Sequence, residues 1–151
     1  MLLRQHFFGR MIDVINCGIG GQEAPEEMSR IEADVVAEAP TLVIRQVGTN
    51  AVYKSYNPDE VRATLAAGLD ILAPLPIDVV LMDSQYTRAI VEPADRLKFA
   101  NTIMSLISDV AAQKRVNPFQ SFALMKRWID DMIPLAEFDD GADAHHHPGR
   151  L

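Results

Sequence analysis

The sequence predicts an α/β fold in which parallel strands alternate with helices in three layers. Short runs of β-branched and aliphatic residues recur at 12–16, 41–47 and 77–82. Each run ends in a glycine-rich or polar loop, and each loop is followed by a stretch with the helical spacing of apolar residues. Strands that are joined through helices of this length lie parallel in one sheet, because the connection crosses back over the sheet face.

The first strand is expected at 12–16, and the glycines at 18–21 then predict a tight loop. The first helix is expected over 24–37. Pro25 suits its first turn, and the two glutamates that follow Pro25 complement the positive end of the helix dipole.

The next two units have clearer boundaries. The run at 41–47 is almost continuously apolar, as buried parallel strands are. Asn57 followed by Pro58 marks the start of a helix that extends to Leu72. The strand at 77–82 leads through a polar loop into a helix over 94–114.

Two further elements complete the pattern. Residues 116–119 predict a short fourth strand, which Pro118 restricts to a sheet edge or a strand end because proline cannot donate to the ladder. A last helix is expected over 121–132. We assign residues 1–141 to a single domain and 142–151 to a disordered tail, because the tail offers no residues for a core.

Composition excludes several classes of function. The chain of 151 residues carries 21 acidic and 14 basic side chains, a formal net charge of −7, so it would repel a nucleic-acid backbone. Its single cysteine excludes an internal disulfide and a multi-cysteine zinc site. No apolar run approaches the roughly 18 residues of a membrane span, and no secretory signal is visible. We expect neither a cofactor nor a metal, while the compartment and the oligomeric state stay open.

Chemistry is expected in the loops after the strands, because open α/β sheets bind ligands beyond the carboxyl ends of their strands. The glycine loop at 18–21 lets the main chain approach a ligand and present N–H groups to it. Asn50, after the second strand, adds a side-chain amide. Two donors that converge on one point are what a tetrahedral acyl-transfer intermediate requires. Asp83 and Tyr86, after the third strand, are candidates for lining a substrate pocket.

Each of these features also has an ordinary structural interpretation. The glycine loop can be a tight turn without a ligand, Asn50 a loop cap, and the third loop a capped loop. A dinucleotide-binding fingerprint is disfavoured, because Glu23 stands where its third glycine belongs. We expect Cys17 to be a small buried thiol rather than a nucleophile. The histidines at 145–147 belong either to a solvated tail, where they could bind a stray metal ion, or to a catalytic block.

The first two loops resemble those of a known family. The run from Val14 to Gly21 (VINCGIGG) and the run from Leu42 to Ala51 (LVIRQVGTNA), one helix apart, are similar to the second and third sequence blocks of the SGNH or GDSL hydrolases. These are serine ester hydrolases. The resemblance implies a flavodoxin-like parallel sheet with strand order 2-1-3-4-5. It also implies that Gly21 and Asn50 join the backbone N–H of the nucleophilic serine in an oxyanion hole.

The same resemblance implies two departures from the family. The family's first block, Gly-Asp-Ser at the end of its first strand, has no counterpart, since none of the six serines follows Gly-Asp. We therefore interpret the chain as truncated at the N-terminus and as lacking a strand that would lie between the runs 12–16 and 41–47. The last block, Asp-x-x-His, is matched in spacing by Asp143 and His146, three residues later than the preceding sequence suggests.

These features together favour an SGNH-type ester hydrolase that acts on small acyl or carbohydrate esters. The chain itself is expected to be inactive, because the segment with the nucleophilic serine is absent from it. The alternative is a catalytically silent relative that binds a small molecule or a protein partner through the same crevice.

Overall fold

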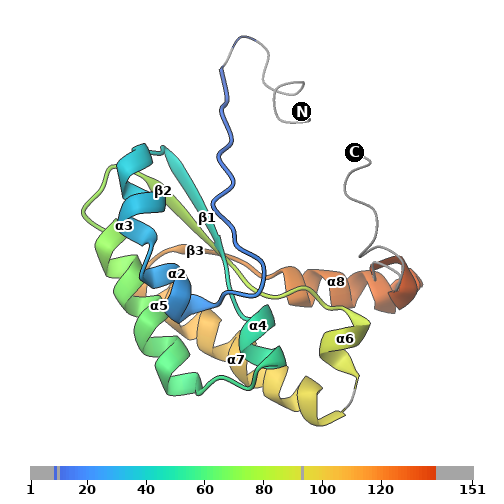
Figure 1. Ribbon diagram of the computed structural model, residues 1–151. Coiled ribbons are helices and arrows are strands. Elements are labelled where there is room, and N and C mark those ends of the chain that lie inside the picture. Colours follow the sequence, from blue (N-terminus) through green and yellow to red (C-terminus); the bar gives the residue numbers. More distant parts are fainter. Residues whose placement is uncertain (1–8, 10, 93, 139–151) are drawn as a thin grey trace.

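The elements alternate along the chain as the fold class requires. The structure is a computed structural model that describes residue 9, residues 11–92 and residues 94–138 (Figure 1). Within these residues the elements are α2 (Ala24–Met28), α3 (Ile31–Asp34), η1 (Val36–Glu38), β1 (Leu42–Gln46), α4 (Thr49–Tyr53), α5 (Pro58–Leu72), β2 (Asp78–Met82), α6 (Arg88–Val91), α7 (Ala94–Lys114), β3 (Asn117–Phe119), α8 (Ser121–Asp130) and η2 (Leu135–Phe138).

The three strands form one parallel sheet in the order β1-β2-β3. Arg45 lies opposite Leu81, and Met82 lies opposite Phe119. This sequential order is the one that the last three strands have in the flavodoxin-like order 2-1-3-4-5. The predicted α/β class with a parallel flavodoxin-like sheet is confirmed, and among the described residues the sheet contains the last three strands of that order. Pro118 lies in the edge strand β3, as its missing N–H requires.

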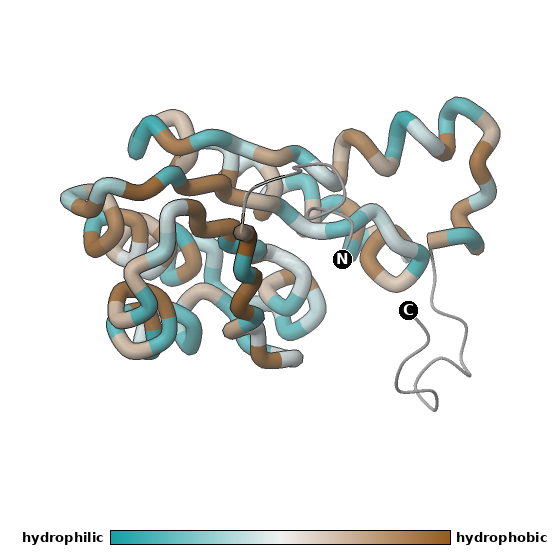
Figure 2. The backbone as a smooth tube through the Cα atoms, turned by 90° about the horizontal axis from the view of Figure 1, so that it is seen from above, coloured by the Kyte–Doolittle hydropathy of each residue, from teal (hydrophilic) through white to brown (hydrophobic). Residues whose placement is uncertain are grey.

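One face of the sheet packs against helices. Helix α5 contacts both α2 and α7, and the three helices lie along the same side (Figure 1). In Figure 2 hydrophobic and hydrophilic residues alternate along the helices, as expected when one side of each helix is buried. Residues of this core include Val61, Leu65, Leu69, Leu81, Ile103, Ile107 and Val110, each no more than 2% exposed.

The opposite face of the sheet is open at β1. Leu42 and Ile44 are 51% and 63% exposed, and Phe119 of β3 is 44% exposed. The described part of the chain therefore covers one face of the sheet well and leaves apolar side chains on the other. The expected three-layer arrangement needs cover on this second face as well.

The predicted strand at 12–16 is wrong. These residues run as an extended segment that forms no strand (blue in Figure 1), and Val14 and Ile15 are 76% and 60% exposed. A β-branched run becomes a strand only when a neighbour accepts its hydrogen bonds. Among the described residues β1 pairs only with β2, so the segment and β1 have not closed the gap between them.

The predicted helix over 24–37 is broken into α2, α3 and η1. The Ser29 hydroxyl donates to the Glu26 carbonyl 2.7 Å away, a local bond that competes with helix continuation. Arg30 then turns its guanidinium toward Asp34, Gln22 and the Cys17 carbonyl. The chain therefore ends α2 and begins α3, and Arg30 between the two helices binds the preceding loop. By contrast, the helix capped by Asn57 and the helix at 94–114 occur where they were predicted.

Candidate functional site

The glycine loop is joined to helix α4 and its C-terminal cap by two direct hydrogen bonds. The Asn50 side-chain Nδ2 donates to the Gln22 carbonyl 2.8 Å away, and Lys54 Nζ donates to the Gly21 carbonyl at 2.6 Å. Gly21 has a φ of +85°, a conformation that a glycine adopts at little cost. The structure therefore brings Asn50 next to Gln22, the residue after Gly21, and so joins the two loops from which donors were expected.

Each expected donor keeps capacity for a ligand. A primary amide nitrogen carries two hydrogens, and the Gln22 carbonyl takes one of those on Asn50. The Gly21 N–H makes no hydrogen bond to any of the described residues. Each of the two groups can therefore donate to a further acceptor without breaking the bond that holds the two loops together.

A second, buried connection runs through Glu23. The residue is 1% exposed, and its carboxylate accepts hydrogen bonds from the N–H groups of Gly48 at 2.9 Å and Ala51 at 2.9 Å. It also accepts from the Ala24 N–H at 3.2 Å, which caps the start of α2. One carboxylate thus serves the first turns of two short helices.

Gly48 has to be glycine. Its φ is +106°, and a Cβ placed on it would lie 2.9 Å from Ile107 Cδ1 and 3.0 Å from Met104 Cε. The tight turn after β1 therefore fits directly onto α7. This contact fixes where α4, and Asn50 within it, begins.

The third loop is tied to the second. The hydroxyls of Thr49 and Ser84 lie 2.9 Å apart, and Ser84 is fully buried. The three loops at the carboxyl ends of the strands consequently form one hydrogen-bonded unit.

Asp83 is 4% exposed, and its Oδ1 accepts the Phe122 N–H at 2.9 Å and lies 2.9 Å from the Ser121 hydroxyl. Burial raises the pKa of this carboxyl, although the bond from the Phe122 N–H opposes the increase. These contacts match the capping interpretation of the loop, with Asp83 closing the first turn of α8. Tyr86 is half-buried and packs edge-to-face on Phe122, with ring centroids 4.8 Å apart. The pocket-lining role of Asp83 and Tyr86 stays a prediction.

The other candidates have simpler surroundings. Cys17 is half-buried and its thiol lies 3.1 Å from the Asp34 carbonyl, in keeping with a packed thiol. Asp143 and His146 lie outside the described residues. Within the part of the chain that the structure describes, no group of three histidine, cysteine or acidic side chains is arranged to hold a metal ion.

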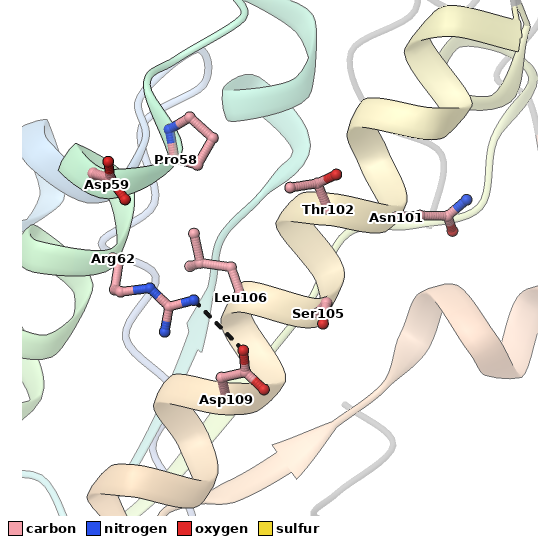
Figure 3. A pocket seen from close by; sticks show the side chains of 8 residues that line it. All are labelled: Pro58, Asp59, Arg62, Asn101, Thr102, Ser105, Leu106 and Asp109. Atoms are coloured by element: carbon pink, nitrogen blue, oxygen red, sulfur yellow. Dashed lines mark hydrogen bonds and ion pairs between the residues drawn. The ribbon is translucent and has the colours of Figure 1, made fainter.

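A surface hollow between α5 and α7 lies apart from the three loops (Figure 3). Arg62 and Asp109 reach across it in an ion pair of 3.5 Å between exposed side chains. None of the residues that line it belongs to the loops that carry Gly21, Asn50 or Asp83. The hollow therefore adds nothing to the candidate site.

Sequence reasoning missed the residues that hold these loops. Glu23 was weighed only as an obstacle to a dinucleotide site. Glutamate is not one of the preferred N-cap residues, so its capping of α2 had no clear sequence signal. The contacts of Lys54 and Ser121 join residues that are 33 and 38 positions apart. No local pattern signals such contacts.

Comparison with known proteins identifies the family. The model of the non-GDSL lipase-like family matches residues 1–146, nearly the whole chain. The chain belongs to this family. None of the curated proteins matches it.

Solved structures support the same fold. An acetylxylan esterase from Geobacillus stearothermophilus aligns with a TM-score of 0.72 and 23% sequence identity over 81% of this chain. A G-D-S-L-family protein from Desulfitobacterium hafniense DCB-2 aligns with a TM-score of 0.60 and 25% identity over 71% of the chain. The alignments cover 60% and 58% of those two proteins. The fold is therefore that of an SGNH/GDSL-like hydrolase, present in part.

No helix among the described residues combines the length and the apolar character needed to cross a membrane.

Proposed function

We propose that this chain supplies the oxyanion hole of an SGNH-type ester hydrolase whose substrates are small acyl or carbohydrate esters. One observation carries the proposal: Asn50 Nδ2 lies 2.8 Å from the carbonyl oxygen of Gln22, the residue that follows Gly21, so its amide sits against the end of the glycine loop. Family membership and the fold of an acetylxylan esterase agree with this chemistry.

In the proposed reaction a serine hydroxyl attacks the ester carbonyl, and the carbonyl oxygen gains negative charge in the tetrahedral intermediate. The Gly21 N–H and the second Nδ2 hydrogen of Asn50 stabilise this oxygen. Because the loops are already held together, the donors need no rearrangement as the charge develops. Asp143 and His146 are the proposed orienting carboxylate and base.

We assign no serine of this sequence as the nucleophile. None of the six serines follows Gly-Asp, and the buried Ser84 and Ser121 use their hydroxyls in structural bonds. We therefore propose that the 151-residue chain alone does not hydrolyse esters.

The test is p-nitrophenyl acetate hydrolysis by this chain and by the same chain extended through any in-frame upstream coding sequence. We expect turnover only from the extended form. Asn50→Ala should lower its kcat by about 10²–10³-fold, the usual effect of removing one oxyanion donor. The matched control is Asn101→Ala, an exposed asparagine on α7, which should leave kcat unchanged.

Two outcomes would contradict the proposal. Full turnover by the extended Asn50→Ala variant would remove Asn50 from the oxyanion hole. Absence of turnover from both forms would favour the catalytically silent relative that binds a ligand or partner in the same crevice.

A further inference from the structure

We infer that Glu23 is a positioning residue of the proposed oxyanion hole, because its buried carboxylate fixes Asn50 against the glycine loop. The inference rests on the proposed function for its catalytic meaning. Its structural content, a dependence of the Asn50 amide on Glu23, can be measured without any turnover.

The carboxylate of Glu23 accepts main-chain hydrogen bonds on both sides of Asn50. Oε1 lies 2.9 Å from the Gly48 nitrogen, and Oε2 lies 2.9 Å from the Ala51 nitrogen. Gly48 is two residues before Asn50 and Ala51 is one residue after it, so the main chain that carries Asn50 is held at two points. Glu23 itself adjoins Gln22, whose carbonyl accepts the Asn50 amide.

Helix α4 lacks a cap of its own, which explains why this contact matters. Gly48 occupies the N-cap position and has no side chain to bind the free N–H groups of the first turn. The carboxylate from the other loop takes that role, and its negative charge also complements the helix end. The geometry of Asn50 is therefore set by a residue 27 positions earlier in the chain.

Only a carboxylate satisfies all of these contacts. Both oxygens of an ionised glutamate accept hydrogen bonds, and here they meet three N–H donors, from Ala24, Gly48 and Ala51. Glutamine has nearly the same shape but presents an NH2 group in place of one oxygen. That group would face an N–H donor in a site that is closed to water, since Glu23 is 1% exposed.

The first measurement uses the unaltered chain. In NMR spectra of protein labelled with ¹³C and ¹⁵N, couplings across hydrogen bonds should connect the Gly48 and Ala51 amides to the side-chain carboxyl carbon of Glu23. Absence of both couplings would overturn the inference at its first step.

The second measurement compares Glu23→Gln with a matched Glu27→Gln variant, a neighbouring glutamate of α2 that binds Arg45 instead. We expect hydrogen exchange of the Asn50 side-chain amide to accelerate at least about tenfold in Glu23→Gln, the effect of losing a bond to a charged group. Glu27→Gln should leave it unchanged. If Glu23→Gln does not fold, Glu23→Asp serves instead, because a carboxylate that is one methylene shorter cannot reach both Gly48 and Ala51.

The outcomes separate this inference from the proposed function. An Asn50 amide that is unaffected by the Glu23 variants, or equally affected by Glu27→Gln, overturns the positioning role. An Asn50 amide that is released while the extended enzyme keeps its full kcat supports the positioning role and overturns the proposed oxyanion hole. In an active extended enzyme we expect Glu23→Asp to lower kcat about tenfold with little change in KM.

Discussion

The side-chain amide of Asn50 donates to the Gln22 carbonyl at 2.8 Å, and this bond joins two loops that are 28 residues apart in the sequence. The same amide is the proposed oxyanion donor. We therefore propose two functions for Asn50, one in holding the loops and one in stabilising charge.

Asn50→Asp is expected to lower the free energy of unfolding by about 1–3 kcal/mol, because a carboxylate oxygen would face the Gln22 carbonyl where an N–H now donates. Urea denaturation followed by circular dichroism measures the change. Asn101→Asp, at an exposed position of α7, is the control and should change stability by less than about 0.5 kcal/mol. Equal effects of the two variants would show that the bond to Gln22 contributes nothing.

Gly48→Ala is expected to destabilise the chain by about 2–4 kcal/mol, combining strain at a φ of +106° with the contact of a new Cβ at 2.9 Å from Ile107. Gly20→Ala is the matched control. It lies in the same group of loops, has no positive φ, and would place its Cβ in open space. Differential scanning calorimetry of both variants tests this, and a stable Gly48→Ala protein would contradict the tight packing of the turn on α7.

The sequence predicts the central elements well because their signals are local. The strands at 42–46 and 78–82 and the helix that Asn57 caps were all recognised from apolar runs and helix-start signals. The proposed donors could also be named from the sequence, since glycine loops and an asparagine after a strand are visible in it, and their role stays a prediction.

Other features depend on partners that the sequence does not reveal. The run 12–16 has strand composition but no strand beside it, so it stays extended and exposed. Short helix α4 was read as a loop, because its cap is Glu23, a residue from another loop. Arg45 was read as part of an apolar strand, although its buried guanidinium contacts α2 and α5.

Arg45→Met is expected to cost about 3 kcal/mol, since it leaves the half-buried Glu27 carboxylate without its partner at 3.1 Å. Burial already raises the pKa of Glu27, and Arg45 opposes that increase. Adding Glu27→Gln to Arg45→Met should therefore recover part of the loss in a double-mutant cycle.

Arg62→Met supplies the control for the arginine. Its ion pair with Asp109, drawn in Figure 3, joins two exposed side chains at 3.5 Å and should be worth less than about 1 kcal/mol. If urea denaturation gave the same loss for Arg45→Met and Arg62→Met, burial would not be what makes the Arg45 pair important.

Asp83→Asn tests the buried carboxyl that caps α8, through the pH dependence of stability. Burial raises its pKa above the ordinary value of 3.8, so the folded protein holds this proton more tightly than the unfolded chain does. The stability gained from Asp83 is then fully present below pH 3.8 and is lost as the pH rises through the folded pKa.

Asparagine keeps an oxygen for the Phe122 N–H but does not titrate. The stability of the original chain relative to Asp83→Asn should therefore increase from pH 7 toward pH 4 in urea denaturation. Asp83→Ala, which also loses the cap, should be about 1 kcal/mol less stable than Asp83→Asn at both pH values. A relative stability that instead fell toward pH 4 would mean that the hydrogen bonds from Phe122 and Ser121 outweigh the burial of the charge.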